Sequence, residues 1–421
     1  MWVNREQEIE LLGKAILNRA KMVVIWGRRR VGKSSLIKKS FKNSTLAYTQ
    51  ALEAAPSIQL RQIYQDIKAF LPITIEPSDW EGLFQLLGAI KEETWLAFDE
   101  FPYLCENHRE LPSRFQKFID HDCPENLHLI FSGSSRKMMY DIFLNADHPL
   151  YGRALLNLEI RPMSIEDFFA FRKKVDIQEL SYFLVVGGIP QYWQILDYAK
   201  DFWNFIDLAF FQTPGLFEFE PMQILKDDGL NGQLPVSILE LIGRGVHKAS
   251  EIASRLKIEQ TSLSRPLQQL MKMHLVEREI PYGESERTSK KSLYKINDPL
   301  LSFYYAVVSP HRSLWPTYNT EKKRSIIHQY LGSQLESLYR KSFHGAKRFW
   351  DRSIEIDCVR ADKEKGLILS ELKWHISSKS ERMAIEKELW QKYEKCILYK
   401  KGSLIFVEII DAKNFLEMFC K

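Results

Sequence analysis

Short apolar runs that end in glycine, serine or acidic residues recur through the first third of the chain. The runs KMVVIW (21–26), TWLAFD (94–99) and LHLIF (127–131) are β-branched or aromatic, and each ends at a small or acidic residue. Such runs are typical of buried strands in a parallel sheet. A further strand is expected near 45–49, and helical apolar spacing predicts helices near 58–70 and 80–91. We therefore predict an α/β fold for this part.

The pattern changes after Pro235. Apolar residues at helical spacing predict three short helices, PVSILELIGRG (235–245), KASEIASRLK (248–257) and EQTSLSRPLQQLMKMHLVERE (259–279). The following REIPYGESERTSKKSLYKINDP predicts two strands around a basic loop, so the whole block predicts a winged helix-turn-helix. Pro266 lies within the third helix, where it is tolerated in the first turn but bends the helix further in.

The last block predicts a second, smaller α/β domain. A helix at 326–343 precedes a strand at 354–361, a charged turn and the apolar strand LILSELKW (367–374). The helix SERMAIEKELWQKYEK and the strand SLIFVEII follow. Asp357 and Glu371 each lie seven residues from Glu364. An antiparallel hairpin centred on Glu364 therefore places the two carboxylates opposite one another.

Composition and charge narrow the class of protein. The 421 residues are 45% hydrophobic and 27% charged, which is typical of a globular protein of about three domains. No apolar run approaches a membrane span and the amino terminus is no signal peptide, so we expect a cytoplasmic protein without membrane contact. The five cysteines are scattered and are expected to be reduced thiols. Residues 233–330 contain fifteen Lys or Arg and nine Asp or Glu, so the basic surplus is local.

The first strand leads into a glycine-bounded loop and then a helix, the context in which G-x-x-x-x-G-K-[ST] binds phosphates. Lys33 is expected to reach the β- and γ-phosphates of ATP or ADP, and the Ser34 hydroxyl to be a Mg²⁺ ligand. Arg28, Arg29 and Arg30 have an alternative interpretation as a basic cluster for nucleic acid. The predicted nucleotide-binding residues of the loop are Gly27, Arg28, Arg29, Arg30, Val31, Gly32, Lys33, Ser34 and Ser35.

An acidic pair ends the strand TWLAFD. We expect Asp99 to hold Mg²⁺ through its water shell and Glu100 to polarise the attacking water. Ser132 or Ser134, after the next strand, is a candidate sensor of the γ-phosphate, although serine turns after strands are common. The spacing between Lys33 and Asp99 fits an additional-strand P-loop ATPase, in which one strand lies between the two Walker strands.

Six motifs together resemble a known family. VNREQEIELL, GRRRVGKSS, FDEFPYL, FSGSS, PLYGR and GGIPQYW are similar, in this order, to the archaeal-type ATPases of the STAND and AAA-related P-loop group. The resemblance covers about 300 residues. It implies that Arg153 contacts phosphate or an interface, and that Gly188 and Pro190 lie against the adenine. An ordinary loop between two helices is the alternative for GGIP.

Two interpretations stay open for the predicted winged helix. In a DNA complex, polar residues of the third helix would face a groove and basic residues of the wing would contact phosphates. Alternatively, the block serves as a lid or as a surface for a protein partner. The groove residues would be Thr261, Ser262, Ser264, Arg265 and Gln268, and the phosphate contacts Arg287, Lys290 and Lys291.

The acidic residues of the last block also form a recognisable pattern. Glu336 in the helix, Asp357, and then Glu371 with Lys373 resemble the PD-(D/E)xK nuclease fold, and after such an ATPase the block is similar to domain of unknown function 234. The resemblance implies that Asp357 and Glu371 bind a metal, that Lys373 stabilises charge on phosphate, and that Glu336 is an outer ligand. The alternative is a domain that keeps the fold for DNA or protein contact only.

We accordingly predict a P-loop parallel sheet (1–160), a helical lid (161–230), a winged helix-turn-helix (231–310) and a restriction-endonuclease-like α/β domain (326–421). The predicted function is a Mg²⁺-dependent ATPase coupled to a DNA-binding or nuclease-like module. The alternative is a nucleotide-dependent switch that binds a protein partner without cutting nucleic acid. A homo-oligomer is compatible with either function.

Overall fold

The computed structural model describes residues 4–351, 354–399 and 403–420, so Val3 of the first motif lies outside the described residues. Its contacts group the chain into two compact units. The first unit contains residues 1–163, 189–191 and 226–229, and the second contains the remainder. Most of the predicted lid therefore belongs to the second unit. The finer division into four domains stays a prediction.

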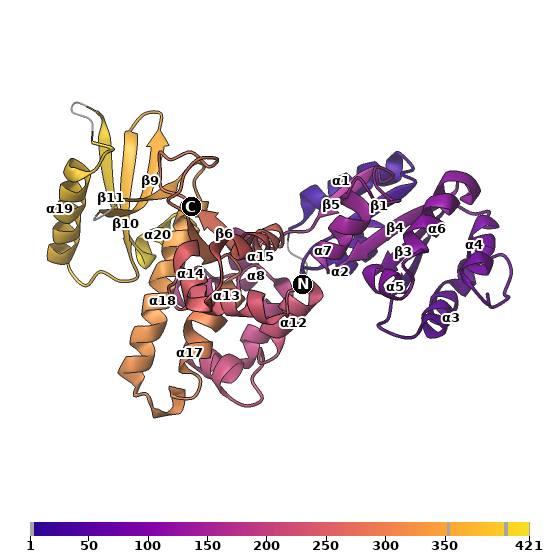
Figure 1. Cartoon of the computed structure of the whole chain (residues 1–421), viewed down its shortest axis with the longest axis horizontal. Helices are drawn as coiled ribbons and strands as arrows, with labels where there is room; N and C mark the ends of the chain where they lie inside the picture. Colours follow the sequence, from indigo (N-terminus) through magenta and orange to yellow (C-terminus); the bar gives the residue numbers. More distant parts are fainter. Residues whose placement is uncertain (1–3, 352–353, 400–402, 421) are drawn as a thin grey trace. The chain divides into compact units, whose positions relative to one another are not determined.

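The first unit is built on a five-stranded, entirely parallel sheet (Figure 1). Its strand order is β2-β3-β4-β1-β5, so β4 lies between β1 and β3, and the strand expected near 45–49 is β2 at an edge. The additional-strand arrangement is thus present, with β4 as the inserted strand. The strands are β1 (Met22–Trp26), β2 (Leu46–Gln50), β3 (Thr94–Asp99), β4 (Leu127–Gly133) and β5 (Leu156–Glu159).

The apolar runs form strands because every side chain of β3 and β4 is buried. Phe98 and Phe131 stack across these two strands with ring centroids 5.7 Å apart, and Phe115 packs edge-on against both. The helices of this unit are α1 (Glu6–Leu17), α2 (Lys33–Ser40), α3 (Pro56–Ile67), α4 (Trp80–Gly88), α5 (Pro102–Asn107), α6 (Leu111–Lys117) and α7 (Arg136–Met139).

The second unit begins with short helices that bury aromatic residues. Ser164 and Asp167 form a capping box at the first of them. Tyr192 and Trp193 are fully buried, and Phe168 packs edge-on against Trp193. These helices are α8 (Ile165–Arg172), α9 (Ile177–Val186), α10 (Pro190–Ile195), α11 (Phe202–Ile206) and α12 (Glu220–Asp227).

Three helices and a hairpin follow, as the pattern after Pro235 predicts. The antiparallel strands β6 (Val276–Glu279) and β7 (Leu293–Ile296) pair around the basic loop. Pro266 is the seventh residue of the third helix, so it lies beyond the first turn and removes one interior hydrogen bond. The helices are α13 (Gln233–Gly243), α14 (Ala249–Leu256) and α15 (Gln260–Lys272).

The carboxyl-terminal part contains a four-stranded mixed sheet in the order β11-β10-β9-β8 (Figure 1). Strands β9 and β10 pair antiparallel from Gly366–Asp362 to Ser370–Cys358, which confirms a hairpin centred on Glu364. Strands β10 and β11 are parallel. The strands are β8 (Lys347–Trp350), β9 (Glu355–Asp362), β10 (Gly366–Lys373) and β11 (Ile405–Asp411).

Two long helices cover opposite faces of this sheet (Figure 1). Tyr339 of α18 contacts Ser370, whereas Lys392 of α19 contacts Glu371, and neighbouring strand residues point to opposite faces. The two long helices are α18 (Thr320–Lys341) and α19 (Lys379–Lys395), and the shorter helices of this part are α16 (Pro299–Phe303), α17 (Ser309–His311) and α20 (Ala412–Glu417). Among the helices that the structure describes, none has the length and apolar character required to cross a bilayer.

Candidate functional site

The loop between β1 and α2 has the backbone of a phosphate-binding site. Gly27 has φ +154°, and a Cβ there would lie 2.3 Å from the Ile160 carbonyl oxygen, so only glycine fits. Arg30 and Gly32 have φ +68° and +102°, in the left-handed region, and Gly32 precedes the first residue of α2. The amino terminus of α2 therefore opens onto the loop, where its amides and dipole favour an anion.

Lys33 lies inside this loop. Its side chain is buried, and Nζ donates to the carbonyl oxygens of Gly27 (3.0 Å) and Arg28 (3.3 Å). Burial lowers the pKa of Lys33, while the charges of Glu100 and Asp99 act in the opposite direction. The ammonium is thus held at the centre of the loop, near the acidic residues at the end of β3.

Asp99 is the centre of a hydrogen-bond network. Its Oδ2 accepts from Ser34 Oγ (2.6 Å) and from the Tyr48 hydroxyl, and its Oδ1 accepts from the Ser132 hydroxyl. Burial favours the neutral carboxyl, but these hydroxyl donors outweigh burial and lower the pKa of Asp99. An ionised carboxylate beside the Ser34 hydroxyl is a pair of hard oxygen donors, which suits Mg²⁺.

Glu100 is held by the turn after β4. Its φ is +54°, in the left-handed region, and its Oε2 accepts from both the amide and the hydroxyl of Ser134, each at 2.9 Å. The two serines therefore divide their contacts, since Ser132 binds Asp99 and Ser134 binds Glu100. A role for either serine in sensing the γ-phosphate stays a prediction.

Several charged residues near the loop were not predicted from the sequence. Asp227 lies 3.9 Å from Arg29, and its charge and that of Arg136 both act on Lys33. Asp228 accepts the Arg136 amide at 2.9 Å, and burial raises the pKa of Asp228 to about 6. No local motif marks Asp227, because it lies almost 200 residues along the chain from the loop that it approaches.

The other residues predicted for this site lie as follows. Arg153 forms a bidentate pair with Asp120, with Nε–Oδ1 2.9 Å and Nη2–Oδ2 2.7 Å. Val31 is buried and its carbonyl accepts from Arg5, while Ser35 is exposed. Gly188 and Pro190 lie between α9 and the first turn of α10. The predicted roles of Arg153, Gly188 and Pro190 stay predictions.

A second candidate site lies where β9 and β10 separate. The ladder between these strands ends at Ser370–Cys358, although the register would next pair Glu371 with Asp357. Instead, Asp357 Oδ2 accepts the Leu372 amide at 2.8 Å. Beyond this point β10 continues along β11 only, so the two carboxylates lie in the fork between diverging strands.

The carboxylates in this fork interact strongly. Burial and the Glu371 charge raise the pKa of Asp357, while burial and the Asp357 charge raise the pKa of Glu336 to about 7. Glu371 Oε2 is buried and has no hydrogen-bond partner among the described residues. We call Glu336, Asp357 and Glu371 the carboxylate cluster. Three carboxylates this close to one another favour a bound cation or proton.

Cations of the same chain already lie at the cluster. Lys373 and Lys392 each place Nζ 3.1 Å from Glu371 Oε1. Arg340 donates to the Asp357 carbonyl oxygen at 2.8 Å and lies 3.9 Å from Glu336. The predicted four residues therefore converge, with Lys373 in an ion pair. The spacing of Arg340, one turn after Glu336, could have indicated its contact, whereas nothing in the sequence marks Lys392.

The cluster is not closed into a preformed metal site. Within residues 4–351, 354–399 and 403–420, no three or more His, Cys, Asp or Glu side chains are grouped so that they could hold a metal ion.

The residues predicted to contact DNA are at the surface. The groove residues predicted on α15, and Arg287, Lys290 and Lys291 of the hairpin loop, are exposed. Lys291 is paired with Glu284 at 3.1 Å.

Two family models match separate parts of the chain. The model of an ATPase domain found predominantly in Archaea matches residues 2–193, and that of archaeal and bacterial proteins of unknown function, domain of unknown function 234, matches residues 304–385. An uncharacterized protein of Methanocaldococcus jannaschii is 28% identical over 98% of this chain and 97% of its own. An uncharacterized ATP-binding protein of the same organism is 47% identical over 47 residues, which are 11% of this chain and 80% of its own.

The fold is also similar to that of a solved enzyme. The structure of the Walker-type ATPase of Pyrococcus abyssi superposes with a TM-score of 0.54 and 21% identity, over 73% of this chain and 96% of its own. The parallel sheet, the glycine-bounded loop with Lys33 and the matched ATPase domain lead to one conclusion. The chain is an ATPase with a P-loop nucleotide site in its first unit.

Proposed function

We propose that this ATPase controls a DNA-directed module formed by residues 231–421, with a metal-dependent, nuclease-like site at its end. The carboxylate cluster carries the proposal. Asp357 interacts with both Glu336 and Glu371, Lys373 pairs with Glu371, and a buried oxygen of Glu371 has no hydrogen-bond partner among the described residues. An ordinary surface ion pair would not require this much buried negative charge.

In the first unit, the residues of the loop would act on the nucleotide. The amides around Gly27–Gly32 would hold the phosphates, and Lys33 would leave its carbonyl partners to reach the β- and γ-oxygens. Ser34 and Asp99 would hold Mg²⁺, which supplies charge neutralisation on the phosphates. Glu100 would orient the attacking water once it is released from Ser134, and Arg153 and Pro190 would complete the site.

At the carboxylate cluster, Asp357 and Glu371 would hold a divalent cation, with Glu336 as an outer ligand. The bound cation would act as a Lewis acid toward a phosphodiester. Lys373 would move from Glu371 to the phosphate and stabilise the charge that develops there. Glu336 would lose its proton when the cation binds, since the two positive species compete for the same carboxylates.

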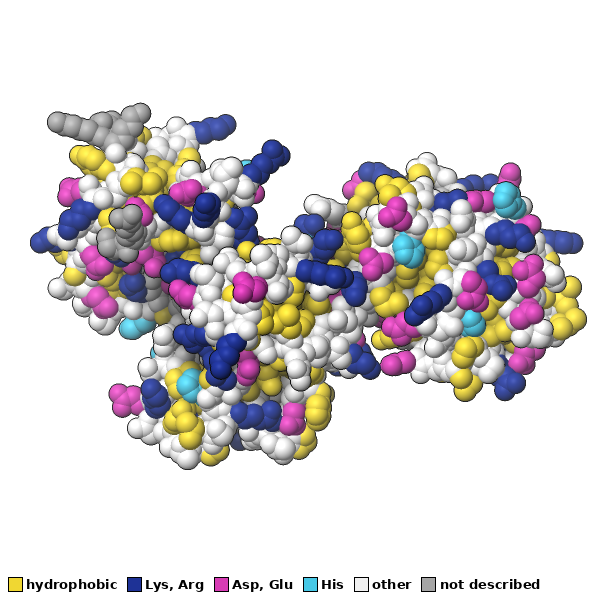
Figure 2. All heavy atoms as spheres, viewed as in Figure 1, with side chains coloured by type: hydrophobic (Ala, Val, Ile, Leu, Met, Phe, Trp, Pro, Cys, Tyr) yellow, Lys and Arg dark blue, Asp and Glu magenta, His cyan; other side chains and the backbone are white. Residues whose placement is uncertain are grey.

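The helices α13–α15 and the β6–β7 hairpin would bring DNA to this site as a winged helix. Support comes from the basic surplus of residues 233–330 and from the exposed polar row on α15. On the face in view, basic side chains are interspersed with acidic ones (Figure 2). Phosphate contacts by a few lysines and arginines therefore fit better than a continuous basic surface.

A supercoiled-plasmid assay with Mg²⁺ or Mn²⁺ tests the nuclease. We expect the wild type to nick or linearise the plasmid, and Glu371→Gln and Lys373→Met to reduce the rate by about 10²-fold or more. Glu386→Gln and Lys387→Met, which change exposed residues of α19, are the matched controls. A wild type that cuts no faster than Glu371→Gln with either metal would exclude the nuclease.

A second candidate function is a nucleotide-dependent switch for a protein partner. The observation that favours it is the pairing of Glu371 with both Lys373 and Lys392, because such pairing neutralises the acid without a metal. In this function the nucleotide site acts as described above, and the end domain (residues 326–421) only provides a binding surface for the protein partner. Loss of cutting together with retained nucleotide-dependent changes would favour the switch.

A further inference from the structure

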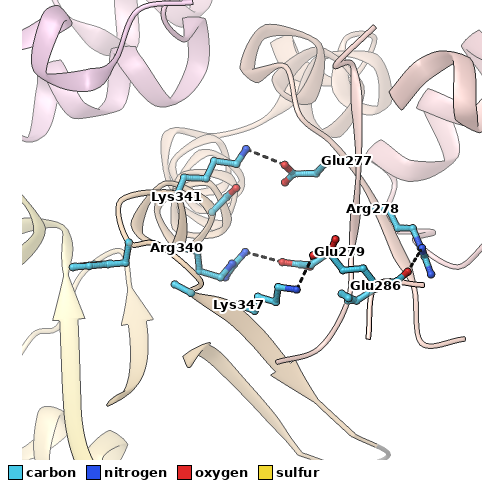
Figure 3. Close-up of a pocket in the computed structure, with 11 residues that line it drawn as sticks. Glu277, Arg278, Glu279, Glu286, Arg340, Lys341 and Lys347 are labelled. Atoms are coloured by element: carbon cyan, nitrogen blue, oxygen red, sulfur yellow. Dashed lines mark hydrogen bonds and ion pairs between the residues drawn. The ribbon is translucent and has the colours of Figure 1, made fainter. Parts of the chain in front are cut away.

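A charged seam joins the β6–β7 hairpin to the carboxyl-terminal sheet within the second unit (Figure 3). It encloses a cavity of about 460 Å³, lined by β6, the hairpin loop, the end of α18 and β8. Among the ion pairs across the seam, three have N–O distances of 3.0 to 3.2 Å, and in each of these the acid belongs to β6 or the hairpin loop and the base to α18 or β8. They are Glu277–Lys341 (3.1 Å), Glu279–Arg340 (3.2 Å) and Glu286–Lys347 (3.0 Å).

The inner pair differs from the two outer ones. Arg340 and Glu279 are 7% and 14% exposed, and Glu279 also contacts Lys295 (2.9 Å) and Arg348 (3.8 Å). Arg340 in turn donates to Asp357 of the carboxylate cluster. Because breaking a buried, multiply paired charge is unfavourable, this pair fixes the hairpin beside the cluster.

The two outer pairs are at the surface. Glu286 is 79% exposed and Lys347 32%, while Glu277 and Lys341 are 33% and 49% exposed. Lys341 also donates to Asn297 at 2.6 Å. One weaker pair has the opposite sense, since Lys291 of the hairpin lies 3.9 Å from Asp351. Exposed pairs of this kind are weak and exchange readily with a competing anion.

We propose that Lys341 and Lys347 are phosphate-binding residues for duplex DNA, and that Glu277 and Glu286 mask them in the DNA-free protein. The proposal rests on the proposed DNA-directed function. A DNA backbone would replace the two glutamates, while the Glu279–Arg340 pair keeps the hairpin in place. The phosphates would then lie next to Arg340 and hence beside the carboxylate cluster.

Binding of a short labelled DNA duplex in EDTA tests the masking without cutting. The double variant Glu277→Gln/Glu286→Gln should bind about tenfold more tightly at low salt. The log–log dependence of affinity on salt should steepen by roughly 2, about one for each lysine released. The variant Glu364→Gln/Glu386→Gln, which removes two exposed acids elsewhere on the end domain, controls for net charge.

A reversal variant separates unmasking from a general charge effect. Adding Lys341→Gln and Lys347→Gln to the double variant should remove the gain in affinity. A gain that persists, or an equal gain in the control, would overturn the masking while leaving DNA binding intact. If neither the wild type nor any variant binds duplex DNA, both this proposal and the proposed function fail.

Two controls accompany these measurements. Thermal unfolding of each variant establishes that it is folded, and a duplex RNA of the same length reports whether the contact is specific to DNA.

Discussion

The pKa values of Asp99, in the nucleotide site, and Glu336, in the carboxylate cluster, are shifted in opposite directions. Asp99 is buried but accepts hydrogen bonds from three hydroxyls, so its pKa is lowered and it is ready to bind a cation. Glu336 is half-buried beside Asp357, and partial burial together with the Asp357 charge raises its pKa to about 7. Asp99 is therefore ionised at neutral pH, whereas Glu336 titrates close to neutral pH.

Replacing Glu336 with glutamine tests this titration through stability. Between its ordinary value of 4.5 and about 7, the folded wild type keeps a proton on Glu336 that the unfolded chain releases. The stability of the metal-free wild type therefore falls as pH rises through this window. Glu336→Gln cannot titrate, so it should be as stable as the wild type near pH 4 and more stable by about 1–3 kcal/mol near pH 8.

Urea unfolding in EDTA at several pH values measures the difference. Glu321→Gln, an exposed acid in the first turn of the same helix, should show no comparable rise with pH. A difference between Glu336→Gln and wild type that is constant from acid to alkaline pH would contradict a raised pKa for Glu336.

Local spacing explains which site residues could be predicted. Lys33, Ser34, Asp99 and the Asp357–Glu371 pair follow from a loop motif, a strand end and a hairpin, each of which acts over a few residues. Other contacts come from distant segments, and no local pattern encodes them. These are Tyr48 on Asp99, Asp227 near Arg29, and Lys392 on Glu371.

At the scale of elements, the positions of helices and strands along the chain were predicted better than the order of the strands in the sheet. The strand expected near 45–49 exists, but the strand between β1 and β3 is β4, because strand order depends on crossovers that no local pattern fixes. The depth of Pro266 within α15 also depended on where that helix begins. The hairpin register was predictable because its turn is short.

Two glycines, one in this hairpin and one between α18 and β8, form a matched pair. Gly366, at the start of β10, and Gly345 both have φ +73°. A Cβ on Gly366 would lie 2.3 Å from the Leu404 carbonyl oxygen, whereas a Cβ on Gly345 would meet nothing within 4 Å. Gly345→Ala should lose about 1–2 kcal/mol of stability from its backbone conformation alone.

Gly366→Ala should lose more, about 3 kcal/mol or above, because the clash with the Leu404 carbonyl, immediately before β11, adds to the same backbone strain. Urea unfolding of the two variants measures the difference directly. Equal losses would mean that β10 and β11 separate at this end without appreciable cost, and that the contact at Leu404 does not fix the sheet.

At the scale of the whole molecule, the chain passes repeatedly between its two units. Residues 226–229 belong to the first unit, while the residues on both sides belong to the second. Asp227 lies in this short segment, 3.9 Å from Arg29 of the phosphate loop, and its charge acts on Lys33. A nucleotide phosphate at the loop would change the electrostatic environment of Asp227, and α12 ends at this same residue.

We therefore expect nucleotide binding to change the dynamics of the second unit. Amide hydrogen exchange measures this change. With Mg²⁺, ATP rather than ADP should change amide exchange in α12 and in residues 233–296 of the wild type. The Glu371→Gln variant should show the same change in exchange, because the carboxylate cluster takes no part in transmitting the effect of the nucleotide. Lys33→Ala should lose the response, whereas Lys39→Ala, at an exposed position of the same helix, should keep it.

Exchange that is identical with ATP, ADP and no nucleotide would mean that the nucleotide site is not coupled to the second unit. A response that survives in Lys33→Ala would mean that it does not arise at the phosphate loop. A response in Glu371→Gln without plasmid cutting by the wild type would instead favour the nucleotide-dependent switch, because the coupling would then exist without a nuclease to control.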